Sequence, residues 1–521
     1  MLSESSLSKT ESYYALFIVA LSLFGFFYNL GIYPFFLEEP RRAIIAYEMV
    51  VSNNYWVPTV MGDLYFKKPP VFNWMIVLAY KTFGYNEISL RLITVISHVV
   101  ISAMLYFFVK WKLGLRTAAF ASIGFLLSAD ILFYFSFLGE IDLFYSLVTT
   151  LALFAIIYYG DKDKLWTLFL IVYTLTAIGF LTKGLTSLPF TAIALLVYFI
   201  VKKRFKVLLS PPHFTGIILF VILVGSYFWK YSTYAPVENW LTVLYSESAD
   251  KAVKGSSLDF LKHLMLFPLA ILGALLPASI SLIAFFKKEK IKAVFQNDFL
   301  KISFLFFLLN FLIYWFSVEG RSRYVYPILP FMIIPLAYMI DKKFDESKWL
   351  KIITVLITLV SILALPATLF FKELAVVDNL ALIVGILAIA ILAMSYYAFK
   401  RKLSSFLQVL GIFAILKIGS ASILPVTRAK TSGAVEDKKL ANEIVEITKG
   451  EAIYRFGNPE IKLSTAFYIE RGKGQILSNK TDLNERFYII SEKDFPIDVD
   501  YKVVLKLRYE HDDVYLVEII K

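Results

Sequence analysis

Two short charged motifs lie in the long segment between the first two apolar stretches of the chain. The first motif reads Phe-Leu-Glu-Glu-Pro-Arg-Arg, and the second reads Tyr-Phe-Lys-Lys-Pro-Pro. Their charged members and the leading tyrosine are Glu38, Glu39, Arg41, Arg42, Tyr65, Lys67 and Lys68. Carboxylates can move or position a proton, and Lys or Arg side chains can bind a phosphate group. Beside a membrane span, this combination is typical of chemistry on a phosphate-bearing lipid.

The two acids of the first motif have a simple alternative role at the start of a helix. Acids favour the positive end of a helix dipole, and Pro40 suits the first helical position. However, keeping two acids and two arginines at a membrane boundary is costly. One carboxylate could act as a base or a positioning group, while the other holds Arg41 or Arg42.

A second acidic pair, Glu140 and Asp142, lies in a very short connection between two apolar stretches. Helix capping is again the alternative, because Asp142 begins the next stretch. We expect this connection to face the same side as Glu38 and Glu39. Two carboxylate pairs on one side would form an active site or the mouth of a cation site. The sequence identifies no cofactor with certainty, and it leaves a divalent cation open.

Further cations lie at the ends of other apolar stretches. Lys183 is in a Leu-Thr-Lys-Gly turn, and Arg321 and Arg323 precede Tyr324 in a Gly-Arg-Ser-Arg-Tyr segment. Lysines near an interface often extend towards lipid headgroups, which is the alternative role for the paired lysines of the second motif. Cations at several span ends on one side are better explained by an anionic ligand, because the arginine fork fits phosphate well.

The composition is that of a membrane protein, whose spans would position these charged residues. The chain has 521 residues, is 58% hydrophobic and has a mean hydropathy of +0.68, which excludes a soluble globular protein. A helix needs about 20 residues to cross about 30 Å of hydrocarbon. About thirteen stretches reach this length, at 13–36, 89–109, 117–137, 142–160, 165–182, 185–201, 214–235, 263–286, 299–318, 323–340, 350–370, 379–399 and 405–425. We therefore predict an α-helical polytopic membrane protein.

Lysine and arginine in alternate loops predict the orientation of these spans. The basic loops are 110–116, 162–164, 202–206, 287–292, 342–348 and 400–402. These loops and the N-terminus should face the cytoplasm. The long first loop, the loop at 236–262 and the C-terminal region should then lie outside, which requires an odd number of spans.

Other compositional features narrow the function. The net charge of +12 is mostly explained by the basic loops and by attraction to anionic membrane lipids. The basic residues are scattered, so nucleic acid binding is not expected. The absence of cysteine excludes disulfides, thiolate metal sites and a cysteine nucleophile. The four histidines have no metal-ligand spacing, so a histidine zinc site is not expected, and only His263, which begins a span on the outer side, is kept as a candidate.

The chain divides into two parts near Pro425. We predict a transmembrane domain at 1–425, with an outer loop at 37–88 whose helix, at 40–53, lies in the interface plane. A small α/β domain outside the membrane should occupy 426–521. Its predicted elements are a helix at 434–449 and strands at 452–456, 466–469, 487–490, 502–507 and 514–519.

Together these segments resemble the polyprenyl-phosphate-dependent glycosyltransferases with the GT-C fold. The likeness is closest to the aminoarabinose transferases of lipid A and to the protein O-mannosyltransferases. Members typically have an acidic pair followed by Pro-Arg or Thr-Arg, an aromatic-acid-Lys-Pro motif, a Leu-Asp, a Leu-x-Lys-Gly turn and an Arg-Tyr segment with two prolines. The corresponding residues here are Glu38 to Arg41, Tyr65 to Pro70, Ile141-Asp142, Leu181 to Gly184, and Arg323-Tyr324 with Pro327 and Pro330. Two positions depart from the pattern: Glu38 replaces the more common Asp, and Lys67 replaces an acid.

The resemblance implies transfer of a sugar from an undecaprenyl-type phosphate donor to lipid A or a related envelope acceptor, with inversion. The reaction would occur on the outer face of the bacterial inner membrane. The implied catalytic residues are Glu38, Glu39 and Asp142, and the implied donor-phosphate ligands are Lys68, Lys183, Arg321 and Arg323. The implied substrate-positioning residues are Arg41, Arg42, Tyr65, Lys67, Glu140 and Tyr324.

Two other functions stay open from the sequence. A protein O-mannosyltransferase-like enzyme would use a protein as the acceptor instead of another glycan or lipid A. A flippase or transporter of lipid-linked sugars would place charges near the bilayer midplane and interrupt its helices there. Here the charges gather at span ends, which favours an enzyme over a transporter.

Overall fold

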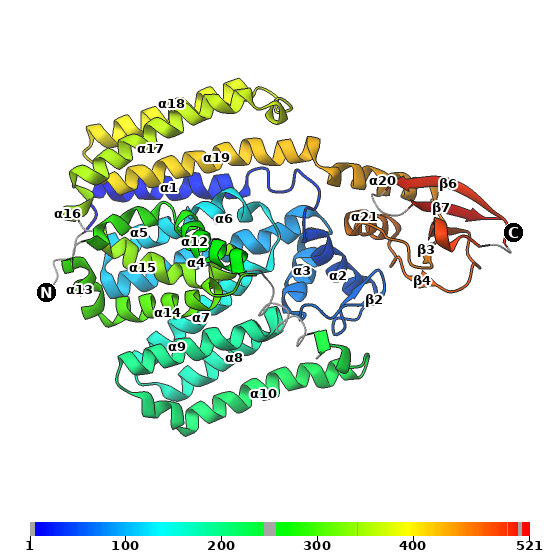
Figure 1. Cartoon of the computed structure of the whole chain (residues 1–521), viewed down its shortest axis with the longest axis horizontal. Coiled ribbons are helices and arrows are strands. Elements are labelled where there is room, and N and C mark those ends of the chain that lie inside the picture. Colours follow the sequence, from blue (N-terminus) through cyan, green and yellow to red (C-terminus); the bar gives the residue numbers. More distant parts are fainter. Residues whose placement is uncertain are drawn as a thin grey trace.

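The computed structural model describes residues 6–240, 242–243, 257–286, 288–340, 342–496, 499–508 and 513–520. A large bundle of apolar helices carries a small α/β domain at one end (Figure 1). The start of α1 (Lys9–Phe27) lies at the opposite end of the long axis from this domain. The described chain thus contains a helical bundle and a smaller α/β domain.

Thirteen described helices of more than ten residues make up the bundle. They are α1, α4 (Glu87–Leu113), α5 (Leu115–Leu126), α7 (Ile141–Asp161), α8 (Leu165–Lys183), α9 (Ser187–Val201), α10 (Pro211–Ser232), α12 (Ser257–Ala274), α14 (Asp298–Trp315), α15 (Leu329–Met339), α17 (Lys348–Ala367), α18 (Leu380–Lys400) and α19 (Ser405–Thr431). Within the described ranges, nine helical segments are long and apolar enough to cross a membrane, or ten if one bent pair is a single span. The polytopic helical membrane protein is confirmed, whereas the count of thirteen spans is not.

Two predicted spans are interrupted by prolines. In the stretch 263–286, α12 ends at Ala274, and the 3-10 segment η4 (Ala278–Phe286) follows Pro277. In the stretch 323–340, the 3-10 segment η5 (Ser322–Ile328) contains Pro327 and precedes α15. Proline removes a backbone donor and clashes with the preceding turn, so it breaks the continuous helix that hydropathy suggests. The second break leaves Arg321 at the start of this 3-10 segment and Arg323 within it.

Local capping explains where several helices begin and end. Ser8 and Glu11 form a capping box at the start of α1, and the Asn86 side chain accepts from Ser89 N at the start of α4. The first predicted span is shorter than expected, because α1 ends at Phe27 and Asn29 has a positive φ of 59°. The remaining residues of that stretch lead into the outer loop.

The outer loop at 37–88 is a compact layer between the bundle and the terminal domain. It contains α2 (Glu39–Val51), a hairpin of β1 (Thr59–Val60) and β2 (Asp63–Leu64), and α3 (Val71–Phe83). The predicted interfacial helix is α2, but ten of its thirteen residues are buried. Its apolar face packs against α3 and against α21 (Leu463–Lys473) in one shared core. Protein therefore covers the apolar stripe that the sequence assigned to the membrane interface.

The terminal domain is a small mixed α/β unit. Its other elements are α20 (Gly433–Ile447), β3 (Ile453–Phe456), β4 (Asn479–Lys480), β5 (Phe487–Ser491), β6 (Tyr501–Arg508) and β7 (Asp513–Ile519). The strand order is β4-β3-β5-β7-β6, with β4 and β5 parallel to β3 and the β5–β7 and β6–β7 pairs antiparallel. The predicted strand at 466–469 is wrong, because it lies in α21, and α19 extends past Pro425 to Thr431.

Polar contacts fix the terminal domain to the outer loop. Tyr47 donates a hydrogen bond from its hydroxyl to the backbone oxygen of Glu470 at 3.1 Å. The buried Arg455 donates to Met61 O at 2.7 Å and pairs with Asp63 at 2.8 Å. The domain thus holds α2 from one side while the bundle holds it from the other, and α2 carries the first charged motif.

Candidate active site

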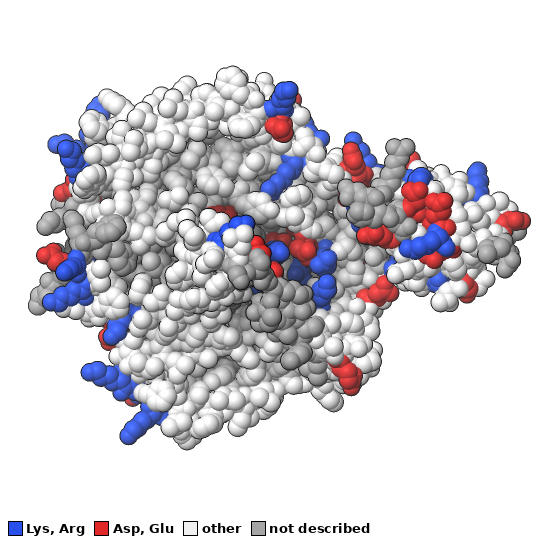
Figure 2. Space-filling model, viewed as in Figure 1, with Lys and Arg blue, Asp and Glu red and all other residues white. Residues whose placement is uncertain are grey.

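A cavity of about 410 Å³ opens where the bundle meets the outer loop. Figure 2 shows charged side chains gathered in this hollow, surrounded by a largely uncharged surface. Every predicted site residue except Glu39 lines it. These lining residues are Glu38, Arg41, Arg42, Tyr65, Lys67, Lys68, Glu140, Asp142, Lys183, Arg321, Arg323 and Tyr324. Five separate segments of the chain, at 38–42, 65–68, 140–142, 183 and 321–324, therefore meet at one site.

The start of α2 contributes one acid and two arginines to the cavity. Glu38 pairs with Arg41 at 2.6 Å across one helical turn, and both side chains are partly exposed. Arg42 is only 5% exposed, and its Nη1 lies 3.5 Å from the Tyr65 hydroxyl. Its Nε atom has no hydrogen-bond partner within the described part of the chain. A buried cation held in this way is available to an anion that enters the cavity.

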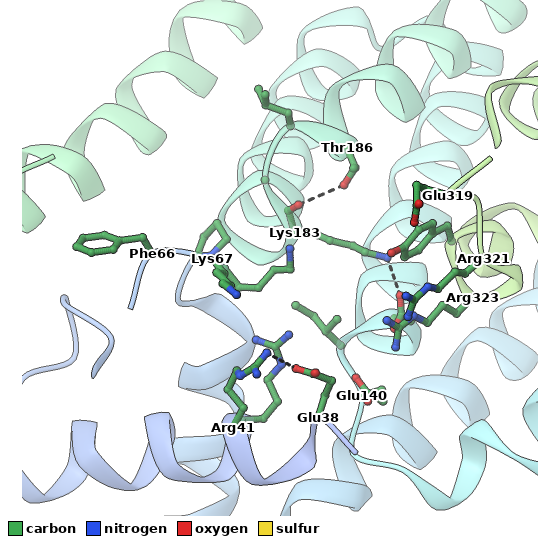
Figure 3. A pocket seen from close by; sticks show the side chains of 18 of the residues that line it. Glu38, Arg41, Phe66, Lys67, Glu140, Lys183, Thr186, Glu319, Arg321 and Arg323 are labelled. Carbon is green, nitrogen blue, oxygen red and sulfur yellow. Dashed lines mark hydrogen bonds and ion pairs between the residues drawn. The ribbon is translucent and has the colours of Figure 1, made fainter. Parts of the chain in front are cut away.

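The start of α7 and the end of α8 contribute the second charged group. Asp142 pairs with Lys183 at 2.6 Å, and both side chains are largely buried. The Lys183 Nζ atom also lies 5.1 Å from the ring centre of Tyr145 and 5.3 Å from that of Tyr324. These contacts hold the ammonium group at the cavity wall. Figure 3 shows Lys183 extending towards the space that Arg321 and Arg323 also face.

Glu140, two residues before Asp142, has an unusual protonation equilibrium. Burial raises the pKa of its carboxyl to about 7, the charge of Asp142 adds to the rise, and Arg42 and Arg323 oppose it. Burial alone would lower the pKa of the Arg323 guanidinium, but Asp142 and Glu140 reverse this and raise it. Within the described ranges, neither Arg321 nor Arg323 forms an ion pair with a carboxylate. The two guanidinium groups can therefore bind an anionic ligand in the cavity.

Glu39 has a different place from the other predicted site residues. It is fully buried, and it pairs with the buried Arg91 of α4 at 2.8 Å. Its two carboxylate oxygens also accept hydrogen bonds from Phe36 N and Gly139 N. Arg91 in turn donates to the backbone oxygens of Leu30, Tyr33 and Pro34. Glu39 thus ties together the backbone segments that carry Glu38 and Glu140, which is a positioning role rather than a catalytic one.

We expect the substitution Arg91→Met to destabilise the protein by about 3–5 kcal/mol, because it leaves the Glu39 carboxylate buried without its cation. Thermal unfolding in detergent measures the effect, with Lys110→Met, an exposed position of the same helix, as the matched control. Adding Glu39→Gln to Arg91→Met should restore part of the loss. Equal unfolding temperatures for Arg91→Met and Lys110→Met would contradict the positioning role of the pair.

Several lining residues were not identified from the sequence. They are Phe66, Thr186, Trp240, Ile313, Tyr314, Ser317 and Glu319, among others. Aromatic and small polar residues are frequent throughout the chain, so no local pattern marks these positions. Glu319 is the exception, because it is a charged residue directly before the Gly-Arg-Ser-Arg segment and could have been identified as a candidate site residue.

None of the described histidines lines the cavity. His263 bonds through its ring to Tyr314 O at 3.1 Å and stacks on Phe267, so it contacts the α14 end of the site without lining the cavity. His511 lies outside the described residues. Within the described residues, no group of three or more His, Cys, Asp or Glu side chains comes together in a metal-binding arrangement.

The fold and the motifs of this chain have counterparts among known proteins. A family model described as dolichyl-phosphate-mannose-protein mannosyltransferase matches residues 67–229. The undecaprenyl phosphate-alpha-4-amino-4-deoxy-L-arabinose arabinosyl transferase 1 of Proteus mirabilis (strain HI4320) is 25% identical over 318 residues, which are 60% of this chain and 55% of that protein. The corresponding transferase of Pseudomonas savastanoi pv. phaseolicola is 30% identical over 199 residues, or 37% of each chain.

The likeness to a solved structure extends over nearly the whole chain. The crystal structure of ArnT from Cupriavidus metallidurans bound to undecaprenyl phosphate matches with a TM-score of 0.73 at 16% identity, covering 97% of this chain and 98% of that one. The fold is therefore that of the GT-C class of membrane glycosyltransferases, as the sequence predicted. Within this class, the chain is similar to the ArnT family of polyprenyl-phosphate sugar transferases, which confirms the predicted resemblance.

Proposed function

We propose that this protein is an integral membrane glycosyltransferase that moves a sugar from an undecaprenyl-type phosphate to lipid A or a related envelope acceptor. One observation carries the proposal: the chain brings twelve predicted site residues from five segments to one cavity at the outer-loop end of the bundle. The ArnT relatives, one of them solved with undecaprenyl phosphate, support this donor class.

The cavity is suited to a lipid phosphate leaving group. When the bond from the sugar to the phosphate breaks, negative charge develops on the phosphate oxygens. Lys68, Arg321 and Arg323 can stabilise that charge without donating a proton, while Lys183 is held beside them by Asp142. Arg41, Arg42, Tyr65, Lys67 and Tyr324 line the remaining wall, where they would orient the sugar and the acceptor.

The stereochemistry follows from a single displacement. Attack by the acceptor on the face of the sugar opposite the phosphate inverts the anomeric carbon in one step. A hydroxyl acceptor needs a base, for which Glu38 and Asp142 are the sequence-based candidates. A phosphate acceptor is already ionised and needs only positioning.

A protein acceptor is the second candidate, and the match of the mannosyltransferase family model to residues 67–229 favours it. The two functions share a lipid-phosphate donor and differ only in the acceptor. Mass spectrometry of lipid A and of envelope proteins, from cells with and without this gene product, separates them. We expect a sugar-sized mass increase on lipid A, and the same increase on proteins alone would favour the second candidate.

We further propose that the protein resides in a bacterial inner membrane, with the cavity and the terminal domain on the outer side. The basic loops and the start of α1 lie at the end of the bundle away from the terminal domain, as positive-inside topology requires (Figures 1 and 2). This orientation places the donor site where no nucleotide sugar is available, which explains the need for a lipid-linked donor.

Engineered cysteines test this orientation without background, because the chain contains no cysteine. We expect Ser52→Cys and Asn484→Cys to react with a membrane-impermeant thiol reagent in intact spheroplasts, because both positions are exposed on the cavity side. Ser210→Cys, at the opposite end of the bundle, should react only after permeabilisation. Reaction of Ser210→Cys alone in intact spheroplasts would place the cavity in the wrong compartment.

A further inference from the structure

A second cavity meets the first one at Glu140. It has a volume of about 660 Å³, and its own wall includes Asp130, Tyr134, Phe135 and Leu138. The two cavities share four lining residues, namely Glu38, Glu140, Arg321 and Arg323. A reaction that joins two large substrates needs such an arrangement, because each substrate requires its own approach to a common point.

The acids at this junction differ in their partners. Glu38 is paired with Arg41, and Asp142 is paired with Lys183, each at 2.6 Å. Asp130 accepts a hydrogen bond from Tyr326 at 2.6 Å. By contrast, no cation of the described chain lies within ion-pair distance of the Glu140 carboxylate, although its side chain is only 3% exposed. A proton acceptor must keep a free lone pair towards its substrate, and of these acids Glu140 best meets that condition.

The backbone around Glu140 is held firmly. Its carbonyl oxygen accepts a hydrogen bond from Thr94 Oγ1 at 3.2 Å, and the preceding Gly139 N donates to Glu39 at 2.7 Å. A Cβ atom at position 139 would lie 2.3 Å from the Leu90 side chain, so only glycine fits there without a shift. The carboxyl group is thus presented to the junction from a fixed turn rather than from a mobile loop.

We propose that Glu140 is the general base of the reaction, and that the acceptor is a hydroxyl group which reaches it from the second cavity. This inference rests on the proposed glycosyltransferase function. The acceptor oxygen forms a bond to the anomeric carbon while the bond from that carbon to the phosphate oxygen breaks. The hydroxyl proton passes to the Glu140 carboxylate, and the polyprenyl phosphate leaves with the electron pair and is stabilised by the cations of the first cavity.

The protonation equilibrium of Glu140 suits this role. Burial and Asp142 raise the pKa of its carboxyl to about 7, so the group can accept a proton at neutral pH and release it again. The charged groups that face it from the surrounding elements are Glu38, Glu39, Arg42, Asp130, Asp142, Arg321 and Arg323. Only the deprotonated form is active, so the rate should fall as the pH decreases through about 7.

The test compares pH–rate profiles of the purified protein and its variants in proteoliposomes, with a polyprenyl-phosphate sugar as the donor. We expect Glu140→Gln to lower kcat about 10²–10⁴-fold at pH 8 and to remove the acidic limb near pH 7. Glu140→Asp should keep that limb and retain part of the rate. Glu373→Gln changes an exposed acid far along the chain and serves as the matched control, with a wild-type profile.

A stability measurement separates lost chemistry from lost structure. The raised pKa of Glu140 means that the folded state favours the protonated acid, so its contribution to stability is present at low pH and lost as the pH rises through about 7. Glu140→Gln cannot ionise, so it should unfold at a higher temperature than the wild type at pH 8. The two proteins should differ little at pH 5. A variant that is more stable yet nearly inactive cannot owe its inactivity to misfolding.

Two results would overturn the inference. A Glu140→Gln protein that keeps the acidic limb, or a wild-type protein without such a limb, would remove Glu140 as the base. The second result would also point to an acceptor that is already ionised. Absence of any transfer by the wild-type protein, from any polyprenyl-phosphate sugar, would instead refute the proposed function itself.

Discussion

Replacing Lys68 with alanine is expected to lower sugar transfer about 10²–10³-fold, because it removes a positive charge beside the leaving phosphate. Lys68 lines the cavity directly before Pro69 and Pro70, whose fixed backbone angles hold the lysine in place. The substitution lies in an outer loop that is anchored elsewhere by α2 and α3, so the protein should still fold and insert.

Two further variants make this expectation specific to charge and position. Lys68→Arg keeps the cation and should recover part of the rate, whereas Lys439→Ala, on the exposed face of α20, should behave as the wild type. The measurement is the rate of purified protein in proteoliposomes at saturating donor. Full activity of Lys68→Ala would remove this residue from the phosphate site.

The second large effect concerns the pair of Asp142 and Lys183. Lys183→Met should lower kcat/KM about 10²–10³-fold, because a cation at the cavity wall is lost. Asp142→Asn should also reduce the rate, because Lys183 then loses the 2.6 Å contact that orients its ammonium group. We expect the double variant to be no worse than Lys183→Met, since residues that act as a unit have non-additive effects.

This double-mutant cycle distinguishes positioning from independent catalysis. If Asp142 were itself the base, the fold-decrease in rate caused by Asp142→Asn would multiply the fold-decrease caused by Lys183→Met. The double variant would then be far slower than either single variant. Strict additivity of the two free energies would therefore contradict the paired role. Thermal unfolding of each variant excludes a general loss of structure as the cause.

Much of the site could be predicted because its residues are charged and lie next to apolar stretches. In a chain rich in aliphatic residues, charges at span ends such as Asp142, Lys183 and Arg323 are costly unless they serve a purpose. Alternate loops face the same side of the membrane, so charged residues in these loops come to lie on one side of it. The sequence could not show that Glu39 forms a buried ion pair with Arg91, because that pairing depends on how α4 packs against the outer loop.

The fold was less predictable where hydropathy and local geometry disagree. Prolines at positions 277 and 327 interrupt two apolar stretches that are long enough to span. The run at 466–469 reads as a strand because it is short, aromatic and β-branched, yet it is buried on nearly all sides within α21. Periodicity carries no information about such a segment, so tertiary packing decides its structure. The same packing hides the apolar stripe of α2 beneath the terminal domain.

The most direct test of the central claim is transfer by the purified protein alone. Proteoliposomes would contain the wild-type protein, an isotope-labelled polyprenyl-phosphate sugar and lipid A, and mass spectrometry would follow the label. We predict that the label moves to lipid A with release of polyprenyl phosphate, and that Lys68→Ala and Glu140→Gln suppress this transfer while Lys439→Ala does not. Movement of the intact donor between leaflets, with no covalent transfer to any acceptor, would contradict an enzyme and identify a transporter.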